Sequence, residues 1–345
     1  MNKISRRRII QAAAAGAATL GFPAIVRSQP RQLVIGGPGG QLAQTQKYIF
    51  PAFEKRYNCK VLYDGGQTLV NAKKVQASPS KPPFDVVMMD EPGTILLARD
   101  KLLEPLKPSQ VKNLSKLAPN AIVKDGIWAV YYIPAISIGY NTRGLKEGLG
   151  SWNDLWNPKL RERVMIPHPK TTQGAHMLAM AAHLETGKPI KEAQYDLDAA
   201  FRKLRTIRSN LLQTYLASAQ ASILLEKGEA WAAAGFFTTY VLGRKAAGVP
   251  IDMARPKEGS FALPKVIAKV KNAASPELAD AWIDACLSEE FQTVWMREFY
   301  GSPTNVNVPV DPSLIPAKDL LFIDSEWHTD RIGETSDRFD REMKV

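Results

Sequence analysis

The chain has 345 residues and a formal net charge of +11 at pH 7, and 45% of its residues are hydrophobic. This length exceeds one typical domain and suits two lobes, each with its own core. It holds only two cysteines, Cys59 and Cys286, which excludes a disulfide scaffold and a thiolate zinc cluster. We expect both to be small buried apolar side chains, and a long-range bridge between them is the alternative.

The first residues predict an export signal. A basic segment, Ser5–Arg8, precedes a weakly hydrophobic Ala/Gly stretch from Ala12 to Val26, and small residues flank Arg27 before the predicted cleavage site. The stretch is too rich in alanine, and too often interrupted by Gly and Pro, for a membrane helix. The paired arginines resemble a twin-arginine signal, so residues 1–28 are predicted to be a signal peptide and the mature protein to be periplasmic.

Much of the positive charge belongs to this signal. Residues 1–28 contain five basic residues and no acid, which leaves +6 of the +11 for the rest of the chain. The remaining Lys and Arg side chains are spread out, without a basic block interleaved with aromatics. This pattern disfavours nucleic-acid binding.

The mature chain begins with strands that alternate with helices. The predicted strands are Gln32–Ile35, Cys59–Tyr63 and Phe84–Met89. Such alternation indicates parallel βαβ units, in which ligands lie beyond the carboxyl ends of the strands. The loops at those ends are Gly36–Gln41, Asp64–Gln67 and Asp90–Gly93, and they supply the candidate ligand residues Gly39, Gly40, Gln41, Asp64 and Asp90.

The stretch Trp128–Gly144 predicts a long strand that is broken at Pro134. Because a proline cannot donate a ladder hydrogen bond, we expect this strand to leave one lobe and enter the other. A single edge strand with a proline kink is the alternative. The predicted return crossing is Val249–Lys269, around the turn Arg255–Gly259.

The pattern repeats after the crossing. Arg163–Ile166 predicts a strand, and Glu229–Phe237 predicts a buried strand, although its alanines would suit a helix equally well. Helices are predicted at Ala175–Thr186, Asp196–Ile207, Ser218–Gly228 and, after the helix start Ser275-Pro276, towards Phe299. We therefore expect an α/β fold with lobe I at residues 29–134 plus 256–303 and lobe II at residues 135–255 plus 304–345.

Catalytic and metal signatures are missing from the sequence. It has no Gly-x-Ser-x-Gly, His-Glu-x-x-His, P-loop or Gly-x-Gly-x-x-Gly motif. His176 and His183 share a helix face but stand two turns, roughly 10 Å, apart. We expect no catalytic residue, no metal site and no cofactor, and we keep a periplasmic hydrolase as the alternative of another class.

Three features favour an anionic ligand. The Gly36–Gly40 loop and the run Thr171-Thr172-Gln173-Gly174 both lead into helix starts, where N–H groups and the helix dipole attract anions. Arg255 could clamp a carboxylate or phosphonate. The alternatives are plain turns, a plain N-cap at Thr171 or Thr172, and a surface arginine. The remaining candidate contacts are Ile136, Phe236, Phe237 and Phe261.

The ordered set of motifs resembles a known family. It consists of FDVVMMDEP, IPAISIGYNT, SWNDLWNPKLRERV, GVPIDMARPKEG and ELADAWIDACLSEEFQTVWMREFYGSPTN. The chain looks like the extracellular solute-binding proteins of ABC importers, in the group of polyamine, ferric-ion and phosphonate binders. The resemblance implies a type II periplasmic binding fold whose two lobes close on a solute by a hinge. It also implies a monomeric, non-enzymatic protein whose partner is the permease.

Departures from that family bear on the ligand. Polyamine binders usually carry a Trp and an Asp soon after the PKEG stretch, whereas Ser260–Lys265 has neither. Ferric-ion binders carry adjacent tyrosines where this chain has Phe236-Phe237. The predicted ligand is therefore a small organic anion or zwitterion. Polyamine binding, through Asp64, Asp90 and Glu91, is the alternative.

Overall fold

The computed structural model describes residues 31–123 and 126–343. The predicted signal peptide lies outside these residues. Across the described part of the chain, strands join into a 13-stranded sheet whose main path is β2-β1-β3-β12-β6-β9-β7-β8. The strands are covered by helices, so the predicted α/β class is confirmed.

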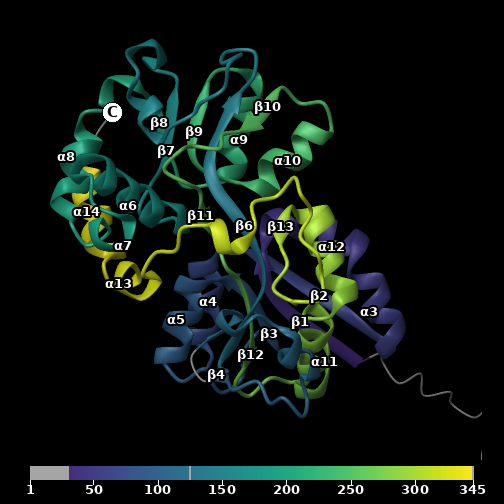
Figure 1. Ribbon diagram of the computed structural model, residues 1–345. Coiled ribbons are helices and arrows are strands. Elements are labelled where there is room, and N and C mark those ends of the chain that lie inside the picture. The colour runs from purple at the N-terminus through teal and green to yellow at the C-terminus, as the bar shows by residue number, and fades with distance from the viewer. Residues whose placement is uncertain (1–30, 124–125, 344–345) are drawn as a thin grey trace, which may run out of the picture. The chain divides into compact units, whose positions relative to one another are not determined.

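One strand, β6 (Trp128–Asn141), belongs to both halves of this path. Its first residues pair with β12 and β5, and from Ala135 onwards it pairs with β11, β9 and β10. Between them, Ile133 and Pro134 pair with the two-residue strand β13. Figure 1 shows β6 running from the strands labelled β1, β3 and β12 towards those labelled β7, β9 and β10. The predicted crossing at Pro134 is confirmed.

The first half of the sheet combines parallel and antiparallel pairs. β1 pairs in parallel with β2 and β3, and β12 runs antiparallel between β3 and β6. Its strands are β1 (Arg31–Pro38), β2 (Cys59–Gly66), β3 (Val86–Asp90), β4 (Leu103–Glu104), β5 (Ile122–Val123), β12 (Lys265–Val270) and β13 (Gly301–Ser302). The helices here are α2 (Leu42–Tyr48), α3 (Phe50–Tyr57), α4 (Thr68–Ala77), α5 (Glu91–Arg99), α11 (Pro276–Cys286) and α12 (Glu289–Phe299).

The second half follows β6 into a smaller set of strands. They are β7 (Val164–Pro167), β8 (Leu211–Tyr215), β9 (Ala232–Phe237), β10 (Ile251–Met253) and β11 (Phe261–Ala262). The helices here are α6 (Thr172–Thr186), α7 (Ile190–Ala193), α8 (Leu197–Arg205), α9 (Ser218–Lys227), α10 (Thr238–Ala246), α13 (Ser325–Asp330) and α14 (Ile332–Glu342). Short 3₁₀ turns occur in both halves. They are η1 (Gly39–Gln41), η2 (Lys112–Lys116), η3 (Pro119–Ala121), η4 (Trp152–Trp156), η5 (Pro158–Leu160), η6 (Arg208–Asn210) and η7 (Ala317–Asp319).

Apolar side chains gather into separate cores along this sheet. In the first core the ring of Trp282 lies 4.9 Å from that of Phe53, and Tyr132 stacks on Trp295 at 5.6 Å. In the second core Phe261 packs edge-on against Trp152 at 5.9 Å. The changeover along β6 falls between Ala135 and Ile136, which belong to different cores.

Both cysteines are buried free thiols, Cys59 in the first residue of β2 and Cys286 at the end of α11. Burial raises the pKa of each thiol and keeps it uncharged. They therefore behave as the small apolar side chains expected from the sequence, and the structure does not join them by the alternative bridge.

Several elements differ from the sequence prediction. β1 continues through Gly36 and Gly37 to Pro38, so the predicted loop there begins later. β8 and the C-terminal helices α13 and α14 had no predicted counterpart. Within residues 31–123 and 126–343, no helix is both long and apolar enough to cross a bilayer.

Gly235 explains an irregularity in β9. Ser137 pairs with Phe236 and Ile138 pairs with Ala234, so Gly235 is the extra residue of a bulge. Its φ is +76°, and an added Cβ would lie 2.9 Å from Pro167 and 3.0 Å from both Gln173 and Tyr215. Glycine is required there because the backbone is left-handed and the space is filled.

We predict that Gly235→Ala lowers the free energy of unfolding by about 2–4 kcal/mol, because left-handed strain and overpacking add. Gly187 at the end of α6 is the matched control, since its φ is +70° and nothing lies within 4 Å of an added Cβ. Gly187→Ala should cost only about 1–2 kcal/mol. Urea denaturation of both variants measures the difference, and equal losses would contradict the packing argument.

Candidate ligand-binding site

Asp90 is the residue where strands of the first core meet helix α6 of the second. It ends β3, and its side chain is 14% exposed. Its Oδ1 lies 2.5 Å from Nζ of Lys265, and its Oδ2 accepts a hydrogen bond of 2.8 Å from the Thr172 hydroxyl. The Asp90 backbone N–H donates to Thr68 Oγ1 at 3.2 Å. The carboxylate thus joins elements of the two cores at the end of a strand.

Lys265 is the first residue of β12 and lies directly opposite Asp90 in the antiparallel ladder. Its side chain is 5% exposed, so the ammonium is almost fully removed from water. Nζ also stands 5.2 Å from the centre of the Phe237 ring. A cation held by a carboxylate and facing an aromatic ring is stabilised by both.

Helix α6 reaches this cluster by its first turn. Thr171 is the N-cap, because its Oγ1 accepts from the Gly174 backbone N–H at 3.2 Å. That leaves the next hydroxyl, of Thr172, for Asp90. Gly174 allows the turn, since an added Cβ would lie 2.4 Å from Cα of Pro169. Gln173 is buried and donates to Ser218 at 3.3 Å.

Of the two adjacent phenylalanines, only Phe237 meets the cluster. Phe236 is fully buried and packs against Tyr215 at 5.7 Å in the interior of its own half. Phe237 faces Lys265 and, at 4.7 Å, the ring of Tyr240. Successive residues of a strand point to opposite sides, which separates the two roles.

Tyr240 lies between Phe237 and the glycine loop that follows β1. An added Cβ on Gly40 would lie 2.2 Å from the Tyr240 hydroxyl, so α10 and η1, which follows β1, are in close contact. Burial and the nearby Asp90 carboxylate raise the pKa of the Tyr240 hydroxyl, which keeps it a neutral donor. Gly39 packs on Gly65, and Gln41 follows them in η1.

Other predicted site residues lie elsewhere. Asp64 pairs with Lys74 through both oxygens, at 2.8 and 2.7 Å. Ile136 and Phe261 are fully buried in the second core. Arg255 is exposed, and its guanidinium donates to the Ser313 carbonyl at 2.7 Å rather than to the cluster around Asp90.

Lys265, Tyr240 and Thr68 are the neighbours of Asp90 that the sequence prediction did not include. A basic residue at the start of a strand gives no local sign that it is buried, because its partner comes from the ladder with β3. Tyr240 carries a weak signal, since it follows Phe237 by one helical turn. We refer below to Asp90, Thr172, Phe237 and Lys265 as the junction cluster.

Two buried histidines and a glutamate lie beside the junction cluster. His176 contacts the carbonyls of Thr172 and Ala262 at 3.0 and 3.2 Å, and burial lowers its pKa to about 4. Burial, with the nearby His176, likewise lowers the pKa of His328 to about 4. Burial raises the pKa of Glu91, which accepts from the Ser325 hydroxyl at 2.7 Å. Glu91, Thr172 and His176 help to line a cavity of about 10 Å³, roughly the space of one water.

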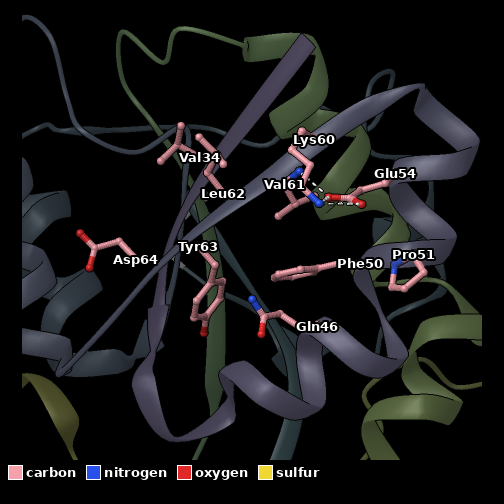
Figure 2. A pocket seen from close by; sticks show the side chains of 10 residues that line it. All are labelled: Val34, Gln46, Phe50, Pro51, Glu54, Lys60, Val61, Leu62, Tyr63 and Asp64. Atoms are coloured by element: carbon pink, nitrogen blue, oxygen red, sulfur yellow. Dashed lines mark hydrogen bonds and ion pairs between the residues drawn. The ribbon is translucent and has the colours of Figure 1, made fainter. Parts of the chain in front are cut away.

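A larger cavity, of about 640 Å³, lies along β2 (Figure 2). Its walls come from β1, β2, α2 and α3, and Asp64 is the one predicted site residue in its lining. Figure 2 shows the Glu54–Lys60 ion pair on the helix side and Asp64 pointing away from it. The Glu54 carboxylate also accepts from the Val61 N–H at 2.9 Å, which satisfies a donor on the open edge of β2. Over the described residues, no group of three His, Cys, Asp or Glu side chains is placed to hold a metal.

Comparison with known proteins identifies relatives. A family model described as bacterial extracellular solute-binding protein matches residues 81–327. A putative 2-aminoethylphosphonate-binding periplasmic protein of Salmonella paratyphi A is 24% identical, over 75% of this chain and 74% of its own. A spermidine/putrescine-binding periplasmic protein of Escherichia coli is 23% identical, over 84% of both. These relatives are named as binding proteins rather than as enzymes.

A solved structure is similar in fold. A periplasmic binding protein from Actinobacillus pleuropneumoniae, with exogenous fructose-6-phosphate bound, superposes with a TM-score of 0.75 at 22% identity. The likeness covers 91% of this chain and 99% of that one. It confirms the predicted periplasmic binding fold.

The buried histidines predict an acid-sensitive stability. A depressed folded-state pKa means that the unfolded chain binds more protons, so stability is full above about pH 6.5 and is lost as pH falls towards 4. Asp324 opposes this shift at His328, whereas Arg331 adds to it. Because Nε2 of His328 has no hydrogen-bond partner among the described residues, His328→Leu should remove about 2 kcal/mol of the stability difference between pH 7.5 and 4.5.

The control is His183→Leu, which replaces a partly exposed histidine on α6. Denaturant titrations at both pH values should show a smaller change in pH dependence for this variant. An unchanged pH dependence in His328→Leu would contradict the prediction.

Proposed function

Because the chain belongs to the family of bacterial extracellular solute-binding proteins, we propose that it captures a small organic anion or zwitterion and delivers it to an ABC permease. The protein is a periplasmic solute-binding component of an ABC transporter. The ligand class, a monomeric state and the absence of catalysis belong to the proposal. A periplasmic hydrolase stays the alternative of another class, and turnover of esters or amides would favour it.

The observation that carries the proposal is the meeting of both cores at the junction cluster. Asp90 and Lys265 come from strands of the first core, while Thr172 and Phe237 come from the second. A solute held between these groups would contact both halves of the molecule at once. Such a site couples binding to closure of one lobe on the other.

The state of the carboxylates favours an anion over a polyamine. Asp64 is already paired with Lys74, and Asp90 is paired with Lys265. Glu91 has a raised pKa and accepts from Ser325, so burial disfavours its charged form. These are the three acids that ammonium groups of a polyamine would need. Each is engaged or disfavoured as an anion, whereas the positive end of α6 and the Lys265 ammonium attract negative charge.

The relatives are named for ligands of two different charge classes. One is named for 2-aminoethylphosphonate, a zwitterion, and another for spermidine and putrescine, which are cations. The engaged carboxylates support the first kind of ligand for this chain. We propose that the bodies that move correspond to the predicted lobes, residues 29–134 plus 256–303 and residues 135–255 plus 304–345, with the return crossing at Leu263 and Pro264 instead of residue 256.

A ligand screen tests the proposed class. A solute at 100 times its dissociation constant stabilises the folded protein by about 2.7 kcal/mol, which raises the melting temperature measurably. We expect such a rise with phosphonates, dicarboxylates or amino acids, and none with putrescine, spermidine or ferric salts. A rise with the polyamines alone would refute the ligand class but not the transport role.

Removal of the Thr172 hydroxyl tests the junction. We predict that Thr172→Ala weakens binding of whichever solute the screen identifies by about 1–3 kcal/mol, because Asp90 loses a hydrogen bond that links the two cores. Thr186→Ala, at the other end of α6, is the matched control, since its hydroxyl bonds within the helix to Ala182 at 2.8 Å. Calorimetry on both variants measures the effect, and equal affinities would count against the proposed site.

A further inference from the structure

The side chain of Lys265 stands in surroundings that suit the ammonium group of a ligand. Its Nζ has a carboxylate oxygen of Asp90 at 2.5 Å and the face of the Phe237 ring at 5.2 Å. A carboxylate and an aromatic face together are a common way for proteins to bind ammonium ions. Here the ammonium belongs to the protein itself.

The ammonium group of Lys265 has more hydrogen-bond donors than the described residues around it have acceptors. Both oxygens of Asp90 already accept, one from Lys265 and one from Thr172. An ammonium has three N–H donors, and Asp90 is the only acceptor that meets Nζ among residues 31–123 and 126–343. Two donors are left on a side chain that is 5% exposed. Buried donors require acceptors, so the group that completes this cluster must bring oxygen acceptors.

A second buried lysine in the same strand offers a comparison. Lys269 is also 5% exposed, and its Nζ lies 2.9 Å from Asp280 and 3.3 Å from Glu104. Both partners of Lys269 are carboxylates of the first half, Asp280 in α11 and Glu104 in β4. Lys269 therefore has two carboxylates as acceptors. Lys265 has one carboxylate, and its other N–H donors have no acceptor among the described residues.

We propose that Lys265 is a built-in ammonium that fills the amine-binding position of this site, excludes amines from it and directs its free N–H groups to an anionic group of the solute. This inference rests on the proposed function in placing the solute at the junction cluster. It narrows the ligand class, because it assigns the position beside Asp90 and Phe237 to the protein. Lys265 is then the residue that determines specificity against cations.

Chemical rescue tests the amine-binding position. Lys265→Ala removes the atoms beyond Cβ, which together make an n-propylammonium ion. We expect n-propylammonium chloride to raise the melting temperature of Lys265→Ala and to leave the wild-type protein unchanged, because the ion restores the charge partner of a buried carboxylate. 1-Propanol, which has the same chain without the charge, should not rescue. Asp90→Asn in the Lys265→Ala background should abolish the response to the amine.

A second experiment tests whether Lys265 binds an anionic group, by measuring the affinity for methylphosphonate with calorimetry. Lys265→Ala and Lys265→Met should each weaken its binding at least tenfold, since both remove the donor. Lys269→Ala loses a buried lysine of the same strand and should keep wild-type affinity within about twofold. Lys265→Met also fills the space of the lysine without its charge, so it should fold even where the alanine variant does not, and it should gain no response to amines.

The outcomes separate this inference from the proposed function. A rise in the wild-type melting temperature with n-propylammonium or putrescine would overturn the inference, and so would a folded Lys265→Ala that ignores the amine. If Lys265→Met kept the wild-type affinity for methylphosphonate, the part of the inference in which Lys265 donates to an anionic group, its anion half, would be overturned. Amine rescue that depends on Asp90, in a protein whose wild type binds no anion of the screen, would support the assignment of the amine-binding position to Lys265, whereas the anion half of the inference and the proposed ligand class would both fail.

Discussion

Removal of Asp90 and Lys265 from water is the constraint on which the junction depends. Each charge is costly to bury alone, and the loss of one partner from such a pair costs about 3–5 kcal/mol. The pair therefore requires β3 and β12 in register, because Lys265 lies opposite Asp90 only in that ladder. The second Asp90 oxygen requires Thr172 and hence the start of α6. A buried ion pair is weak evidence for stability, since apolar residues of similar size often do as well. Its position between two cores argues for a role in binding.

The two crossings between the cores lie beside Lys265 of the junction cluster. β6 passes between the cores at Ala135 and Ile136, and the chain returns through Leu263 and Pro264 directly before Lys265. The Leu263 N–H donates to the Pro134 carbonyl at 3.0 Å, so the two crossings are bonded to each other. Any movement of one half against the other must change backbone angles near these residues. Rotation at the crossings would therefore shift Lys265 and change its distance to groups of the second core.

The sequence predicted the architecture better than the side-chain roles. Pro134 within an apolar run predicts the crossing, and Asp90 and Thr172, which are hydrogen-bonded to each other, are predicted from their places at the end of a buried strand and the start of a helix. The sequence pattern does not predict the burial of Lys265, because that burial depends on a ladder with β3, about 175 residues away in the chain. Phe236 and Phe237 could not be distinguished because a strand buried on both faces has no polar side to orient it. Arg255 is a candidate from its place at the predicted return crossing, yet its side chain is exposed and bonded to Ser313.

The link between Thr172 and Asp90 also sets a condition on how a solute can drive closure. This hydrogen bond and the contact between Gly40 and Tyr240 join the two halves directly. A ligand shifts such an equilibrium only by the contacts that it makes in the closed form and not in the open one. Under the proposal, the remaining N–H groups of Lys265 make a contact of this kind, because Nζ lies beside Asp90 and the Phe237 ring, and Asp90 is bonded to Thr172. A solute with an anionic group would then stabilise the closed form, whereas a cation would compete with Lys265 for Asp90 and would favour neither form.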